Sequence, residues 1–160
     1  VLVGVAAVAL PTLGSDVNYG GRLAGLGALR GAKYQYICAR LQPAIGSRTV
    51  IAASEIGYLG YYCHARILDT FGLVSPGVTR FYPLPAGQTV PGVTYAIAPG
   101  TVRRYRPDYL VTLDAFARRS IMRDRYFQSH YRRIMMVPDR SFGSTGIFVF
   151  VRQDVRAPTS

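Results

Sequence analysis

Residues Thr49 to Pro76 read TVIAASEIGYLGYYCHARILDTFGLVSP, in which two apolar runs alternate with turn residues. The continuous apolar run Thr49–Ala53 is typical of a strand that is buried on both faces of a sheet. The aromatic segment Glu55–Tyr62 predicts a short helix, and Arg66–Thr70 predicts the next strand. If the two strands are parallel neighbours, their carboxyl ends share the sheet edge at which open α/β sheets usually bind ligands.

The rest of the chain extends this α/β pattern. A helical pattern runs from Tyr19 to Gln42, and the chain from Asp114 to Met122 or beyond also reads as helical. Residues 71–100 form a long Pro- and Gly-rich segment, a length typical of a functional lid or a partly disordered insertion. We predict an α/β fold with a mostly parallel mixed sheet flanked by helices and an antiparallel C-terminal strand pair. The three remaining strands are expected at Tyr109–Leu113, Arg133–Val137 and Gly146–Arg152.

The length of 160 residues fits one domain. The apolar run Val1–Leu10 is shorter than the roughly 20 residues that a membrane-spanning helix needs. It is either a buried first strand or the end of a transmembrane helix, and the absence of an initial Met favours the second. We therefore expect the end of a transmembrane helix and a linker over 1–18, one α/β domain over 19–153 and a polar tail over 154–160.

The charge is strongly positive, with a formal net charge of +11, and the 49% hydrophobic content excludes a disordered chain. Either the basic surface is simply solvated, or it meets an anionic partner such as lipid head groups, lipid-linked phosphates or nucleic acid. Nucleic acid is not expected, because we find no zinc-ligand spacing, RNP-like motif or helix-turn-helix. Arg103, Arg104 and Arg106 lie in the densest basic region and are the predicted contacts to an anion or lipid phosphate.

Two acids, Glu55 and Asp69, stand at predicted strand ends in a chain with only eight acidic residues. They could form a general acid/base pair or hold a hard cation. Alternatively, Glu55 caps the following helix, and Asp69 pairs with an arginine such as Arg66 or Arg80. We expect no metal site and no cofactor, since the two histidines are isolated and no phosphate-loop, zinc-protease or hydrolase motif occurs.

Three tyrosines, Tyr58, Tyr61 and Tyr62, lie on the predicted aromatic helix. Tyr58 and Tyr62 are four residues apart and share one helix face, with Tyr61 beside them. They could form a platform that faces a sugar or a lipid, or they could pack amphipathically with their hydroxyl groups in solvent. With Glu55 and Asp69 they make up the predicted binding cleft.

The two cysteines, Cys38 and Cys63, are too few for a disulfide framework and form no CxxC motif. They could pair in an oxidising compartment. The pattern favours two small buried apolar residues instead.

Three segments resemble one known family: IAASEIGYLGYY from Ile51, RILDTFGLVSP from Arg66 to Pro76, and RPDYLV from Arg106 to Val111. Together they resemble the C-terminal soluble domain of polytopic bacterial glycosyltransferases of the GT-C type. These are similar to the mannosyl- and arabinofuranosyltransferases that use polyprenyl-phosphate sugars. The resemblance covers roughly Arg22 to Arg152.

The resemblance implies a domain that follows the last transmembrane helix and lies on the extracytoplasmic face of the cell membrane. The catalytic carboxylates of such enzymes lie in the membrane part, so the isolated chain is expected to support donor or acceptor binding without catalysing transfer. The implied partners are the membrane portion of the same polypeptide, anionic lipid or polyprenyl-phosphate sugar, and a glycan acceptor. Two alternatives remain: a free-standing α/β module that binds a sugar or small ligand, and a small enzyme that uses Glu55 and Asp69.

Overall fold

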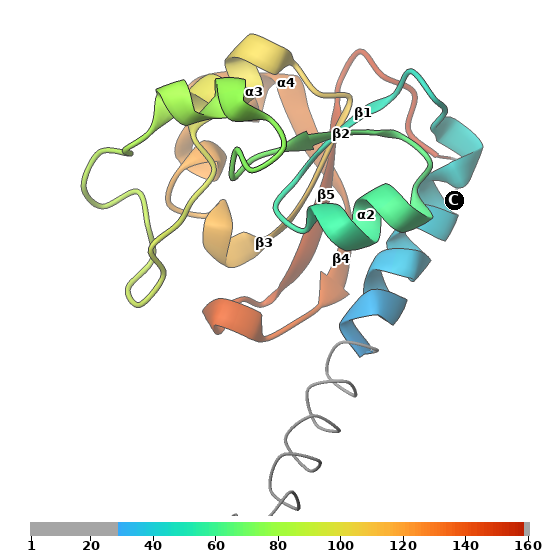
Figure 1. Ribbon diagram of the computed structural model, residues 1–160, viewed down its shortest axis with the longest axis horizontal. Helices are drawn as coiled ribbons and strands as arrows, with labels where there is room; N and C mark the ends of the chain where they lie inside the picture. The colour runs from blue at the N-terminus through green and yellow to red at the C-terminus, as the bar shows by residue number, and fades with distance from the viewer. Residues whose placement is uncertain (1–28, 159–160) are drawn as a thin grey trace, which may run out of the picture. The chain divides into compact units, whose positions relative to one another are not determined.

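The computed structural model describes residues 29–158 (Figure 1). The chain divides into two units, Val1–Ala32 and Lys33–Ser160. Only residues 29–32 of the first unit are described, and they are helical. The predicted transmembrane end and linker over 1–18, and the first part of the helix predicted from Tyr19, lie outside the described residues. The sheet and the helices that flank it belong to the second unit.

The sheet has five strands in the order β2-β1-β3-β5-β4. β1 pairs in parallel with β2 and β3, whereas β5 pairs antiparallel with β3 and β4. This arrangement confirms the predicted α/β class, with a mixed sheet and an antiparallel C-terminal pair. The strands are β1 (Val50–Ala53), β2 (Arg66–Asp69), β3 (Tyr109–Leu113), β4 (Tyr131–Pro138) and β5 (Gly146–Arg152).

Helices cover both faces of the sheet (Figure 1). Helical residues 33–41 and α2 (Ile56–Tyr62) lie on one side. The helices α3 (Pro99–Tyr105) and α4 (Arg125–His130) lie on the other. The central strand β3 is buried at all five positions, which explains its uninterrupted apolar sequence.

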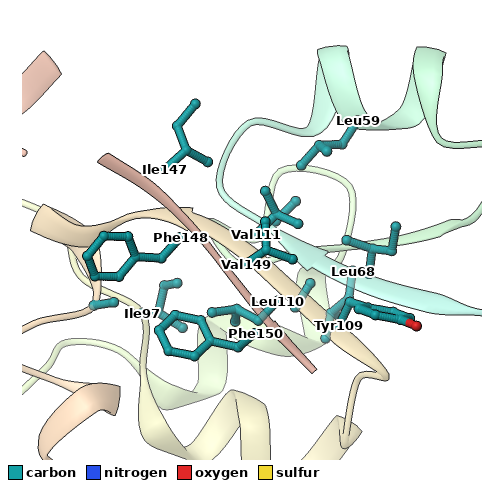
Figure 2. Close-up of a cluster of buried hydrophobic side chains, with 14 of the residues drawn as sticks. Leu59, Leu68, Ile97, Tyr109, Leu110, Val111, Ile147, Phe148, Val149 and Phe150 are labelled. Carbon is teal, nitrogen blue, oxygen red and sulfur yellow. The ribbon is translucent and has the colours of Figure 1, made fainter. Parts of the chain in front are cut away.

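The core is a single cluster of aliphatic and aromatic side chains. Figure 2 shows Leu110 and Val111 of β3 beside Val149 and Phe150 of β5, with Leu59 reaching the cluster from α2. Val149 and Phe150 are neighbours on one strand and point to opposite faces, so β5 contributes to both halves of the core.

The helix predicted from Asp114 to Met122 is wrong. The structure has two separate 3-10 turns there, η3 (Asp114–Phe116) and η4 (Ile121–Arg123). The Oγ atom of Ser120 donates to the carbonyl oxygen of Phe116, a local side-chain bond of the kind that competes with a regular helix.

Two short helices were not predicted, although each begins with a recognisable residue. Pro99 opens α3, a position where its fixed φ and missing N–H cost nothing. Asp124 caps α4, since its carboxylate accepts the backbone N–H of Phe127 at 3.0 Å.

The long segment after β2 is tied back to the sheet by Tyr82. Its hydroxyl lies 3.0 Å from the carbonyl oxygens of both Thr70 and Ala96 and accepts the N–H of Ala98 at 3.2 Å. Burial raises the pKa of the Tyr82 hydroxyl above its ordinary value of 10.0, so the group remains a donor at neutral pH. The segment also contains the 3-10 helix η2 (Pro76–Phe81).

Cys38 and Cys63 form a disulfide, with their Cα atoms 4.7 Å apart. The expectation of two unpaired apolar cysteines is therefore wrong. The bridge joins helical residues 33–41 to the C-terminal end of α2, where Cys63 is the C-cap. Both residues are buried, because the two helices pack together on the same side of the sheet.

Replacing both cysteines, as Cys38→Ala/Cys63→Ala, should lower the free energy of unfolding by about 3 kcal/mol, the loop-closure value expected for a 25-residue separation. Urea denaturation of the oxidised protein and the variant measures the difference. Adding a reductant should bring the wild-type protein close to the variant and leave the variant unchanged. Identical midpoints for oxidised and reduced wild type would contradict a stabilising bridge.

Candidate functional site

Buried aspartates mark three strand ends at one edge of the sheet. Asp69 is the last residue of β2, Asp114 follows β3, and Asp139 follows β4. The pairing of the strands places all three at the same edge, which is the carboxyl edge of the parallel strands. A buried carboxylate needs hydrogen-bond donors, and here the connecting loops supply most of them.

Asp69 fixes the turn that leaves β2. Its Oδ1 accepts the backbone N–H of Phe71 at 2.8 Å, and its Oδ2 accepts the N–H of Val74 at 2.9 Å. The N–H of Asp69 itself donates to the Oγ of Ser75. Among the described residues, the bonds of this carboxylate are to the backbone and not to Arg66 or Arg80, so the alternative of an arginine partner is wrong.

Gly72 is required in this turn for two reasons. Its φ of +90° is a conformation that residues with a Cβ rarely adopt. A Cβ at this position would also lie 2.8 Å from the side chain of Thr79. The turn is therefore a rigid structure, defined by one carboxylate and one glycine.

Asp114 and Asp139 hold the other two loops of this edge. The Oδ1 of Asp114 accepts the N–H of Thr145 at 2.6 Å, and its Oδ2 pairs with Arg118 at 3.2 Å. Asp139 accepts the N–H of Ser141 and pairs with Lys33, each at 2.8 Å. Burial works to raise the pKa of Asp139, but the hydrogen bonds from Lys33 and Ser141 outweigh it and hold the pKa below 3.8.

Four of the five residues of the predicted binding cleft lie together. A hollow of about 430 Å³ is lined by Gly57 and by Glu55, Tyr58, Tyr61 and Tyr62. Asp69 does not line it. Glu55 occupies the N-cap position of α2 as expected, but its side chain makes no capping hydrogen bond. The hollow thus combines one carboxylate with three phenol rings.

The tyrosine rings of this hollow differ in their packing. Tyr58 stacks on Tyr34 with ring centroids 5.5 Å apart and planes 9° apart. Tyr62 is half-buried and meets the exposed Tyr61 edge-on at 5.0 Å. A ring held by its neighbours beside an exposed ring gives a hollow with an apolar wall and polar hydroxyl groups, which suits a sugar or another flat polar ligand.

The three arginines predicted to contact an anion are engaged within the domain. Arg103 pairs with Asp124 and lies over the ring of Tyr126 at 5.7 Å. Arg104 lies 5.9 Å from the Tyr105 ring centroid, and Arg106, the C-cap of α3, pairs with Asp154 at 3.9 Å. The structure thus gives all three arginines contacts within the domain, and a contact to phosphate stays a prediction.

The sequence reasoning missed Asp114 and Asp139, although a shared signal was present. Each strand that reaches the carboxyl edge before a tight turn ends in an apolar run and then Asp: RILD69, YLVTLD114 and MMVPD139. Within residues 29–158, no group of three histidine, cysteine or acidic side chains could hold a metal ion. The helices of this range are all too short or too polar to cross a membrane.

Comparison with known families matches residues 27–155, which include both cysteines, the tyrosine hollow and all three strand-end aspartates. The chain belongs to the family described as a domain of unknown function, DUF8728. No curated protein and no solved structure matches it. The description of this family names no activity, so a function must be argued from the site.

The change Asp69→Asn should lower the free energy of unfolding by about 1–3 kcal/mol, because an amide leaves one buried backbone N–H without its acceptor. Hydrogen exchange should locate the loss at the amides of Phe71 and Val74. Asp154→Asn, at an exposed acid on the opposite edge, is the matched control and should leave both amides protected. Unchanged exchange in Asp69→Asn would contradict this role.

The lowered pKa of Asp139 predicts a pH-dependent contribution to stability. A carboxyl group whose pKa is lower in the folded state stabilises the fold above its unfolded pKa, and the contribution is lost as the pH falls through the folded value. Lys33→Met should therefore cost about 1 kcal/mol at neutral pH. The difference from wild type should shrink as the pH falls below 3.8, which urea titrations at a series of pH values measure. A difference that is constant over this range would contradict the assignment.

Proposed function

We propose that this domain is the extracytoplasmic C-terminal part of a membrane glycosyltransferase that uses a polyprenyl-phosphate sugar. In this proposal it binds donor or acceptor without performing the chemistry. The observation that carries the binding role is the hollow formed by Glu55, Tyr58, Tyr61 and Tyr62. The segments that resemble the GT-C family include these residues.

The disulfide supports the location. Structural disulfides persist in oxidising compartments and are rare where thiols are kept reduced. The Cys38–Cys63 bridge is buried between elements far apart in sequence, which fits a structural bond better than an exchanging one. A domain on the outer face of the membrane would meet such an environment.

Asp69 argues against the alternative of a small enzyme with a Glu55–Asp69 pair. Both Asp69 oxygens accept backbone N–H groups of the turn after β2, and Asp69 does not line the hollow that contains Glu55. The free-standing binding module remains the second candidate, because the same hollow would serve it.

The test is performed on the intact membrane enzyme encoded by the complete reading frame. Tyr61→Ala removes the exposed ring of the hollow and should raise the KM for donor or acceptor about tenfold, with a smaller change in kcat, if the ring contributes about 1.4 kcal/mol of binding. Tyr36→Ala, at another exposed tyrosine outside the hollow, is the control and should leave KM unchanged. Equal KM values for the two variants, or a reading frame with no membrane segments, would contradict the proposal.

A further inference from the structure

An apolar patch interrupts the polar surface at the carboxyl edge. In the turn that follows β2, the exposed fraction is 40% for Phe71, 83% for Leu73 and 64% for Val74. Phe142, in the loop between β4 and β5, is 53% exposed. Phe71 and Phe142 both pack on Phe116, with ring centroids 6.0 and 5.3 Å away, so the aromatic part of the patch is continuous. We call these four exposed residues the edge patch. Patches of this kind mark interaction surfaces.

The exposure of these side chains is built into the fold. The carboxylate of Asp69 binds the N–H groups of Phe71 and Val74, and Gly72 turns the chain between them. Leu73 lies between these fixed residues and is 83% exposed. A chain that uses a buried charge to hold two aliphatic side chains in water is presenting them to a partner.

The charge around the patch identifies the chemistry of that partner. Arg118 donates to the carbonyl oxygen of Gly143 beside Phe142, and Arg140 is exposed two residues before Phe142. The aspartates of this edge, Asp69, Asp114 and Asp139, are all buried and hydrogen-bonded. Arg118 also pairs with the buried Asp114, so the exposed positive charge beside Phe142 is that of Arg140. An apolar surface with a cationic residue beside it suits an anionic bilayer.

We propose that the carboxyl edge is the membrane-facing surface of the domain and that Leu73 and Val74 enter the interfacial region of an anionic bilayer. Arg140 then meets the lipid phosphates. The inference rests on the proposed membrane location, but it requires no glycosyl transfer. It is therefore tested with vesicles alone, and its failure would leave the transferase assay as a separate question.

The protein contains no tryptophan, so a single Trp reports its own surroundings. Leu73→Trp places the reporter on the patch, and Gln153→Trp places a matched one at an exposed residue after β5, on the opposite edge. Both are made in the full chain and mixed with phosphatidylcholine–phosphatidylglycerol vesicles that contain brominated lipid. Emission from Leu73→Trp should shift to shorter wavelength and be quenched, whereas emission from Gln153→Trp should do neither.

Two further variants test the apolar and the cationic contributions to vesicle binding separately. Leu73→Ser/Val74→Ser should weaken vesicle partitioning about tenfold or more, as expected when two aliphatic side chains no longer leave water. Arg140→Gln should weaken binding to anionic vesicles and leave binding to pure phosphatidylcholine unchanged. Equal quenching at the two reporter positions, or no quenching in vesicle-bound Leu73→Trp, would overturn the proposal. A concentration-dependent shift without vesicles would overturn it too, because it would make a second copy the partner.

Discussion

The buried carboxylate of Asp69 is the interaction on which the carboxyl edge depends. It sits at the end of β2, where a parallel strand must give way to a loop with unpaired backbone N–H groups. The Asp69 carboxylate accepts two of these N–H groups and thereby fixes the backbone of the turn. Asp114 and Asp139 repeat the same solution at the ends of β3 and β4. Three loops are thereby fixed by charges that never reach the surface.

This use of acids also explains the electrostatic character of the domain. Three of the eight acidic residues are buried at the carboxyl edge, and none of the arginines is among the buried residues that the structure describes. The turn after β2 also exposes an apolar patch, and the exposed Arg140 lies near its Phe142; for this reason we propose a lipid surface as the partner.

The sequence predicted the strands well because their signals are local: the apolar runs of β1, β3 and β5 and the turn residues between them determine where each strand lies.

The sequence analysis failed where a tertiary contact decides the local structure. The segment after Asp114 has a helical pattern, but the structure has two separate turns there. The Asp114 carboxylate accepts the N–H of the distant Thr145, and Ser120 donates to the carbonyl oxygen of Phe116 within the segment. The cleft residues on α2 were brought together as expected, since they share one short helix. Asp69 was misplaced, because spacing along the chain cannot show which way a strand-end carboxylate turns. The disulfide joins residues whose proximity arises only when two helices pack on one face.

The account's central claim is that this domain works in an oxidising space beside a membrane. The most direct test is the redox state and accessibility of Cys38 and Cys63 in intact cells that produce the complete protein. The account predicts that neither cysteine reacts with a thiol reagent until a reductant is added, and that a reductant unable to cross the membrane is sufficient once the fold is opened by mild denaturant. Free thiols in freshly isolated protein, or thiols that only membrane-permeant reagents reach, would contradict it.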